Sequence, residues 1–350
     1  MPRPRPASAA NARDACALGI DLGGTHLRTL AWSPARGLLV RRKVPSRVSE
    51  GPAALLRRMA SEARAVRALS GLRPSAFRAV GVGAPGPLDP RRGIILDSPN
   101  LPGFASAPLA AALRRATGLP VALENDARCA AWAEYTLGAG RGGRDLACLT
   151  LGTGVGGGLV LDGRLRVGPD ATAGELGFLY VDPSGPRASF GPPGSLEAFA
   201  SATGIARMAR AALARRRRGP LWRLCGGRPA RVSAAMAHAA LRLGDPSARE
   251  AFRRAGAALG VGVAGLINAL NLDCVVLCGG VMDGGGRELL AQVRETARRA
   301  CYAAPFRRCR IVAGELGDDA GAVGAALLAL LALHASSSAA SAAERARRRR

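Results

Sequence analysis

The chain has 350 residues, 48% hydrophobic and only 4% aromatic, so it can form two domains with aliphatic cores, and its composition excludes general disorder. Its formal net charge of +25 would suit a nucleic-acid partner, but Lys43 is the only lysine and no DNA-binding motif accompanies the arginines. The arginines gather in segments such as Arg215–Arg218 and Arg345–Arg350, which we interpret as basic fringes of an enzyme.

The cysteines and the chain ends bear on the cellular compartment. The eight cysteines are dispersed and form no C-x-x-C pair, which is typical of reduced thiols in a cytoplasmic protein. The N-terminus has no apolar segment of the secretory type. The apolar run Ala320–Leu333 is short for a membrane span and contains glycines, so it predicts a packed helix and no membrane association.

Residues 1–15 and 334–350 are rich in Ala, Ser, Pro and Arg and are predicted to be disordered tails. The first half of the body alternates short apolar runs with amphipathic segments. It is predicted to contain strands at Ala17–Ile20, Leu27–Trp32 and Leu38–Val44, a helix at Pro52–Leu69, a strand at Ala79–Gly83, a helix at Leu109–Thr117, a strand at Val121–Leu123 and a helix from about Ala127 to Tyr135.

The second half begins with the same pattern, a strand, a glycine-rich turn and a returning strand. Its predicted elements are strands at Leu146–Leu151 and Leu159–Leu161, helices at Leu196–Ala214, Val232–Leu243 and Ala251–Asn271, and a strand at Cys274–Leu277. Recurrence of one unit predicts a duplicated mixed α/β fold with a cleft between the halves.

The two glycine-rich turns lie between strands, so they match neither a dinucleotide-binding loop nor a Walker loop. A turn of this kind can still present backbone N–H groups to a phosphate, since no Cβ blocks the approach. Thr25 and Thr153 can each add a hydroxyl. Glycine turns that merely close hairpins remain the alternative, but two turns at equivalent places favour phosphate binding.

Five motifs in this order resemble the ROK family of repressors and sugar kinases, within the actin-like ATPase superfamily. The resemblance spans residues 17–333 and rests on Leu18–Arg28 (LGIDLGGTHLR), Gly81–Asp89 (GVGAPGPLD) with Pro99–Phe104 (PNLPGF), Leu123–Ala127 (LENDA), Leu149–Gly163 (LTLGTGVGGGLVLDG) and Val275–Met282 (VVLCGGVM).

The resemblance implies an α/β, duplicated actin-like ATPase (ribonuclease H-like) fold, with two domains and a central cleft. The implied domains are residues 16–124 and 125–333, with the last helix packing back on the N-terminal domain. A homodimer is also implied.

The resemblance assigns Asp126 as the base that orients a sugar hydroxyl and accepts its proton; Asn125 or Asp126 could also cap the following helix, and the two roles are compatible. Asp21 would hold Mg²⁺ through water, the alternative being a turn-forming aspartate. ATP would be bound by Gly23, Gly24, Thr25, Gly152, Thr153, Gly154, Gly279 and Gly280, and the sugar by Gly86, Asn100, Asn125, Asp126, Glu175 and Glu197.

The chain departs from the family at the four zinc-ligand positions, which are Phe178, Ala188, Phe190 and Ser195. None of these side chains is a zinc ligand, so we predict no structural zinc and expect Phe178 and Phe190 to pack together in its place. Loss of the family histidine at Phe178 also removes a hydrogen-bond donor to the sugar. His26 and His238 are predicted to have no catalytic part.

The sequence therefore predicts a cytoplasmic, ATP-dependent hexose kinase, most simply a glucokinase that makes glucose 6-phosphate. Another hexose or N-acetylhexosamine as substrate, polyphosphate as donor, and a sugar-binding protein without turnover remain open. A sugar-sensing repressor is disfavoured, because only about twenty residues precede Asp21, too few for a winged helix.

Overall fold

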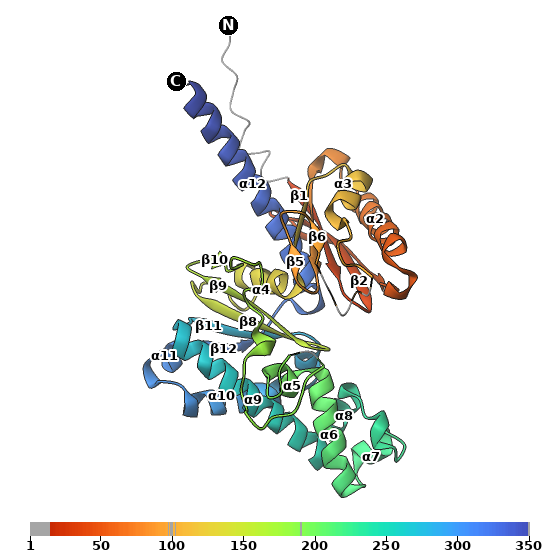
Figure 1. Ribbon diagram of the computed structural model, residues 1–350, viewed down its shortest axis with the longest axis vertical. Helices are drawn as coiled ribbons and strands as arrows, with labels where there is room; N and C mark the ends of the chain where they lie inside the picture. The colour runs from red at the N-terminus through yellow and green to blue at the C-terminus, as the bar shows by residue number, and fades with distance from the viewer. Residues whose placement is uncertain (1–14, 97, 99–100, 102, 190, 349–350) are drawn as a thin grey trace. The chain divides into compact units, whose positions relative to one another are not determined.

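The computed structural model describes residues 15–348 except 97, 99, 100, 102 and 190, and the described chain forms two compact units (Figure 1). Unit 1 contains the described residues up to Ala133, together with Gly168–Thr172 and the residues from Asp319 onward. Unit 2 contains Glu134–Val167 and Ala173–Asp318. The sequence placed the boundary after Glu124, whereas the chain leaves unit 1 later, within a helix.

Unit 1 is built on a five-stranded sheet with the order β3-β2-β1-β4-β7. The first three strands form an antiparallel meander, and β4 and β7 continue the sheet in parallel with β1. Its elements are β1 (Cys16–Leu22), β2 (His26–Ser33), β3 (Gly37–Pro45), η1 (Val48–Glu50), α2 (Pro52–Leu69), η2 (Pro74–Ala76), β4 (Phe77–Ala84), β5 (Leu88–Asp89), β6 (Ile94–Ile95), α3 (Leu109–Thr117), β7 (Val121–Asn125), α4 (Asp126–Thr136, which crosses into unit 2) and α12 (Ala320–Arg348).

The two faces of this sheet are packed in different ways. Alternate residues of β1, Leu18 and Ile20, join an apolar core with Leu55 and Met59 of α2, as the period of a strand requires. The opposite face carries Gly19 and Gly81, where an added Cβ would collide with the backbone of α12. Helix α12 therefore lies directly on β1 and β4 (Figure 1).

Helix α12 is longer than the sequence predicted. The predicted tail from His334 is described as helix up to Arg348, and its many alanines, the strongest helix formers, account for the difference. The segment Gly317–Ala335 is long and apolar enough to cross a membrane by length and composition, and 44% of it is buried within the structure. The predicted tail at residues 1–15 lies outside the described residues, apart from residue 15.

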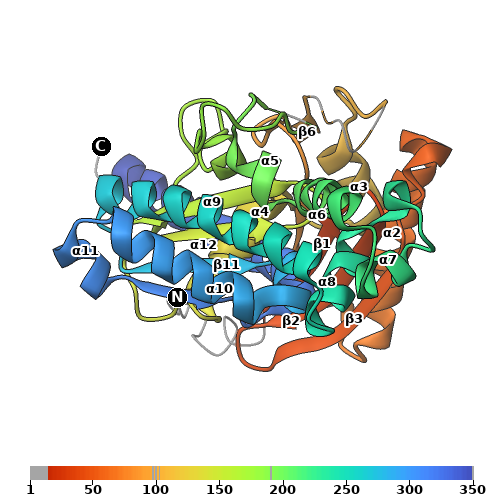
Figure 2. The same cartoon turned by 90° about the horizontal axis from the view of Figure 1, so that it is seen from below.

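Unit 2 repeats the same sheet with the order β10-β9-β8-β11-β12, again an antiparallel meander followed by two parallel strands. Helices α9 and α10 lie side by side against it (Figure 2). Its elements are β8 (Leu146–Leu151), β9 (Val155–Leu161), β10 (Arg164–Leu165), η3 (Leu176–Phe178), α5 (Leu196–Ala200), α6 (Ala202–Arg216), α7 (Pro220–Leu224), η4 (Pro229–Arg231), α8 (Ala234–Arg242), α9 (Pro246–Leu270), β11 (Cys274–Cys278), α10 (Gly280–Ala300), α11 (Ala303–Arg308), β12 (Arg310–Ala313) and η5 (Gly317–Asp319).

The predicted helix at Leu196–Ala214 is instead two helices, because Ser201 is extended between them. The Ser201 hydroxyl caps α6 by accepting a hydrogen bond from Gly204 N at 3.0 Å. The freed amide of Ala202 donates to Gly152 O at 2.8 Å. The break thus fixes the start of α6 to the second glycine turn.

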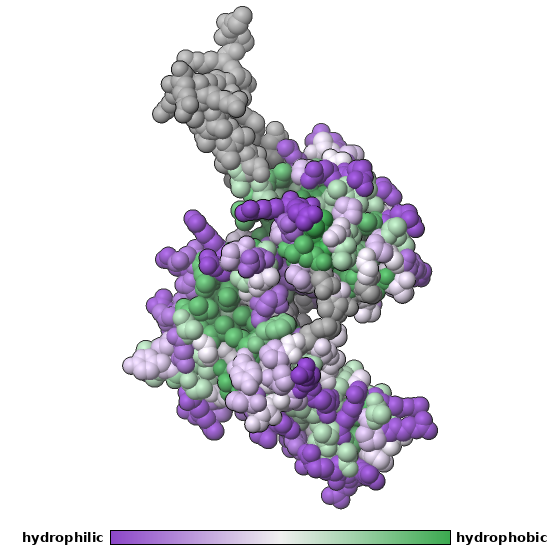
Figure 3. Space-filling model, viewed as in Figure 1, coloured by the Kyte–Doolittle hydropathy of each residue, from purple (hydrophilic) through white to green (hydrophobic). Residues whose placement is uncertain are grey.

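The arginine run Arg215–Arg218 lies at the end of α6, where hydrophilic side chains cover helices α6 to α8 (Figure 3). Arg215 and Arg216 pair with Glu250 at 2.7 and 2.8 Å, and both arginines are solvent-exposed. Exposed pairs of this kind contribute little stability, so the run behaves as a solvated charged face.

Candidate active site

The carboxyl ends of three parallel strands bring the predicted acidic residues to one edge of the unit 1 sheet. Asp21 of β1 pairs in register with Gly83 of β4, and Gly83 pairs with Glu124 of β7. A Cβ added to Gly83 would lie 3.3 Å from the Cα of Asp126. The register therefore places Asp21 and Asp126 along the same edge, and the missing side chain of Gly83 lets the start of α4 approach the sheet there.

Asp126 begins α4, and its Oδ1 accepts a hydrogen bond from Ala127 N at 2.8 Å. The capping bond to the third amide comes from its neighbour, since Asn125 Oδ1 accepts from Arg128 N at 3.1 Å. Asn125 is thus the helix cap and Asp126 keeps its second oxygen for other partners. Burial raises the pKa of Asp126, while the two nearby backbone amides and the charge of Arg128 oppose the rise.

A buried ion pair sets the position of this corner, and the sequence did not reveal it. Arg128 is almost fully buried, and its Nε and Nη2 lie 2.7 and 2.6 Å from Glu124 Oε1. The same oxygen accepts from Asn125 N at 2.7 Å. Because removing one partner would leave the other charge buried and unpaired, the pair constrains the strand end that carries Asn125 and Asp126.

Cys129, one turn into α4, lies beside Gly83 at the same corner, since a Cβ on that glycine would be 3.3 Å from its Sγ. Burial raises the pKa of its thiol, and the negative charges of Glu124, Asp126 and Asp21 raise it further. The thiol is therefore protonated and unreactive, a buried filler beside the carboxylates.

The first glycine turn, Gly23–Thr25, is held by its surroundings in unit 1. Gly23 N donates to His26 O at 3.0 Å, which closes the turn. Ser46, fully buried, donates its hydroxyl to Gly24 O at 2.8 Å and its amide to Thr25 O at 2.9 Å. Beside the turn, Arg28 Nη1 lies 3.2 Å from Asp21 Oδ2, so the predicted magnesium-holding carboxylate already has a cationic neighbour.

The second glycine turn, Gly152–Gly154, is supported by a carboxylate. Glu197 Oε2 accepts a hydrogen bond from Val155 N at 3.0 Å, and a Cβ on Gly154 would lie 2.5 Å from the same oxygen. Thr203 donates its hydroxyl to Thr153 O at 3.2 Å. A side chain at position 154 would therefore displace the Glu197 carboxylate from this hydrogen bond.

The predicted adenosine motif, Gly279-Gly280, meets this turn. Gly279 has φ +92°, and a Cβ there would lie 2.7 Å from Leu151 O, at the end of β8. Both the conformation and the space demand glycine. Gly280 then opens the 21-residue helix α10, whose N-terminal amides and dipole favour an anion in front of them.

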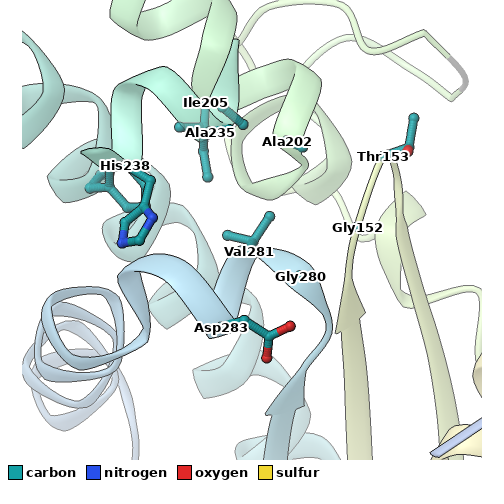
Figure 4. A pocket seen from close by; sticks show the side chains of 11 residues that line it. Gly152, Thr153, Ala202, Ile205, Ala235, His238, Gly280, Val281 and Asp283 are labelled. Carbon is teal, nitrogen blue, oxygen red and sulfur yellow. The ribbon is translucent and has the colours of Figure 1, made fainter. Parts of the chain in front are cut away.

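These pieces of unit 2 enclose a cavity of about 500 Å³. Gly152 and Thr153 line one end and His238 the other, with Val281 and Ile205 between them (Figure 4). A Cβ on Gly152 or Gly280 would meet nothing within 4 Å, so both glycines border open space. The remaining lining residues are Ala202, Ala234, Ala235, Phe252, Gly280 and Asp283.

The size and lining of the cavity fit a nucleotide. A volume of this order is usual for small-molecule sites, which are mostly apolar with a few placed polar groups. The end at Gly152, Thr153 and Gly280 offers amides and a hydroxyl for phosphate, and the middle offers aliphatic surface for a flat ring. Two motifs that lie far apart in the chain, at Gly152–Thr153 and at Gly280, therefore contribute to one site.

The predicted sugar ligands are placed unevenly. Asn125 lies beside Asp126, and Gly86 follows β4 with φ +94°, a conformation that favours glycine. Glu175 is exposed on the loop after Gly174, and Glu197 already supports the second turn; neither lines the cavity. Asn100 lies outside the described residues.

The four substituted zinc positions form no apolar cluster in the described residues. Phe178 is 50% exposed, with its ring beside Gly191, so its predicted burial is not observed. Phe190 lies outside the described residues. Ser195 is fully buried, held by the bridge of its backbone to Tyr180, and its hydroxyl has no hydrogen-bond partner among the described residues.

Comparison with known proteins agrees with this geometry. The ROK family matches residues 17–332. A glucokinase from Thermotoga maritima is 35% identical over 308 residues, 88% of this chain and 95% of the relative, and an N-acetylmannosamine kinase from Escherichia coli is 31% identical over 88% of this chain and 96% of the relative.

Among solved structures, a ROK family glucokinase from Streptomyces griseus in complex with glucose and AMPPNP superposes with a TM-score of 0.78 at 33% identity, covering 90% of this chain and 99% of that one. The matches confirm the predicted family and the duplicated actin-like fold.

Proposed function

The chain belongs to the ROK family, and from that premise we propose that it is an ATP-dependent kinase that phosphorylates a hexose, most simply glucose to glucose 6-phosphate. The observation that carries the proposal is the cavity of unit 2, which the second glycine turn and the Gly279-Gly280 motif both help to form. The nucleotide bound by the similar Streptomyces griseus glucokinase supports ATP as donor.

In this proposal phosphoryl transfer relies on positioning and charge. In unit 2 the amides of Gly152–Gly154 and of the α10 N-terminus bind phosphate, and in unit 1 the amides of Gly23–Thr25 are a second set of phosphate ligands. Asp126 binds the sugar hydroxyl, aims it at the terminal phosphate and accepts its proton late in the reaction. Asn125 binds a neighbouring sugar hydroxyl.

Mg²⁺ would be held through water by Asp21, where it would neutralise phosphate charge. The fit is reasonable, because Asp21 lies at the strand edge that also carries Asp126 and directly before the first glycine turn. Arg28 would then share the Asp21 carboxylate with the bound ion's waters.

The further parts of the proposal rest on the family. We propose Gly86, Asn100, Glu175 and Glu197 as sugar ligands, no structural zinc, a homodimer, and a location in the cytoplasm without nucleic-acid or membrane partners. The predicted domains, residues 16–124 and 125–333, differ from the two units described above, because unit 1 extends to Ala133 and includes the residues from Asp319 onward.

N-acetylmannosamine is the second substrate to consider, because a kinase named for it is 31% identical to this chain. The substitution of the family histidine by Phe178 favours testing it, since the sugar site then offers one donor fewer.

The test is a coupled assay of the full chain with ATP and Mg²⁺ across glucose, mannose, fructose, N-acetylglucosamine and N-acetylmannosamine. Turnover of one hexose with a KM below the millimolar range supports the proposal. Folded protein that turns over none of the five, with either ATP or polyphosphate as donor, would refute it and leave a sugar-binding protein as the better description.

A further inference from the structure

His238 is the unexplained polar group of the cavity. It lies on α8, and its Nε2 is buried without a hydrogen-bond partner among the described residues. A buried polar atom without a partner costs free energy, so its retention at a cavity wall points to a ligand that supplies the missing bond. From the sequence alone, this histidine is one position of an ordinary helical pattern.

The position of His238 identifies which part of a nucleotide it would meet. Gly152 and Thr153 mark the phosphate end of the cavity, and His238 lies at the opposite end (Figure 4). Between the two ends the walls are aliphatic, with Ile205 and Ala235 facing Val281. A nucleotide whose phosphates lie at the turn would therefore extend its base toward His238, between apolar surfaces that suit a flat ring.

The chemistry of the imidazole fits the role of an acceptor. Burial lowers the pKa of His238, and the charge of Arg242 lowers it further while Glu288 opposes the shift, so the ring is neutral near pH 7. A neutral imidazole has one N–H and one bare nitrogen. The ring is also fixed in place, since it contacts Phe252 with centroids 6.3 Å apart.

We infer that His238 recognises the nucleobase of the phosphate donor, with Nε2 accepting a hydrogen bond from the exocyclic amino group of adenine. The inference rests on the proposed function, which makes ATP the donor. Adenine presents an amino donor at this position where guanine presents a carbonyl acceptor, so an acceptor at the base end of the cavity distinguishes the two bases. His238 is thus a specificity residue, remote from the transferred phosphate.

The test measures nucleotide binding by calorimetry on the full chain, without sugar, so that turnover is not needed. The ligands are ATP, GTP and purine riboside triphosphate, which lacks the amino group. The proteins are the wild type, His238→Phe, which keeps a ring against Phe252, and His238→Gln, which restores an acceptor. Thermal unfolding of each variant verifies that it is folded.

We expect the wild type to bind ATP about fivefold to tenfold more tightly than purine riboside triphosphate. His238→Phe should bind the two equally, and His238→Gln should recover part of the difference. Equal binding by the wild type, or a loss in His238→Phe that is the same for both nucleotides, would overturn the inference.

The outcomes separate this inference from the proposed function. A wild type that prefers ATP but phosphorylates no hexose would refute the proposed kinase and leave His238 as the base-recognition residue. A wild type that phosphorylates a hexose without regard to the amino group would refute the role of His238 alone.

Discussion

The two glycine turns occupy equivalent places in sheets of the same strand order, but different groups hold them. The turn of unit 1 is bound by the Ser46 hydroxyl and follows Asp21, whereas the turn of unit 2 is supported by the Glu197 carboxylate and follows Thr150. Unit 1 therefore concentrates carboxylates at its strand edge, and unit 2 offers amides, a helix N-terminus and an apolar cavity. The two units therefore share one scaffold, and the side chains and turns at their strand ends give each unit a different chemical role.

The largest effect on activity should come from substituting Asp126, the proposed base of unit 1. Asp126→Asn is expected to reduce kcat by about 10²–10⁴-fold, because the variant cannot accept the hydroxyl proton. Kinetics with a circular-dichroism check of folding measure it. Glu62→Gln, a matched change on α2 outside the family motifs, should leave the rate unchanged; a comparable loss in this control, or full activity of the Asp126 variant, would contradict the assignment.

In unit 2, backbone strain at Gly279 should lower both the stability of the protein and its affinity for ATP. Gly279→Ala forces a side chain onto φ +92° and against Leu151 O, and should destabilise the fold by about 1–3 kcal/mol while weakening ATP binding. Urea unfolding and nucleotide calorimetry provide the two readouts. The control is Gly37→Ala, where φ is +70° but no atom lies within 4 Å, with an expected cost of about 1 kcal/mol. An equal loss of stability in both variants would show that the close contact with Leu151 O does not contribute.

The supports of the two turns should also differ in strength. Glu197→Gln replaces a charged acceptor of the Val155 amide and is expected to raise KM for ATP about tenfold, with a parallel rise in KM for the hexose if it also binds sugar. Ser46→Ala removes one neutral hydrogen bond in unit 1 and should change KM for ATP about threefold or less. Steady-state kinetics in both substrates test the pair, and a larger effect at Ser46 would reverse the comparison.

The smallest effect concerns pH. The folded Asp126 carboxyl binds its proton more tightly than the unfolded one, since burial raises its pKa, so its contribution to stability is present at low pH and is lost as pH rises through the two pKa values. Asp126→Asn removes this loss, and the stability of the variant relative to wild type should be greater at about pH 8 than at about pH 4. Denaturant titrations at both pH values measure it; an unchanged difference would show that folding does not shift the pKa of Asp126, and an opposite one that folding lowers it.

Much of the frame could be predicted because it depends on local patterns. The apolar periodicity of Pro52–Leu69 and Leu109–Thr117 matches α2 and α3, and Leu146–Leu151 matches β8. The repeated strand, glycine turn and strand revealed the duplication, and Gly152, Thr153 and Gly280 of the glycine motifs line the cavity of unit 2.

The remaining features depend on contacts that no local pattern encodes. The break at Ser201 exists because the Ala202 amide bonds to Gly152, and the burial of Arg128 depends on Glu124 one turn away on the preceding strand end. His238 stands in an ordinary helical pattern, so only its place on the cavity wall distinguishes it. Strand β12 was missed because its four residues carry too little periodicity.

Helix α12 lies close against its sheet, since a Cβ on Gly19 or Gly81 would collide with the main-chain oxygen of Ala322 or Ala325. A larger residue at either glycine would push the helix away from the sheet, whereas an ordinary apolar core tolerates exchanges of similar volume. After selection for folded protein, a mutational library should therefore contain few variants at these glycines. The depleted positions would mark where helix α12 lies on the sheet.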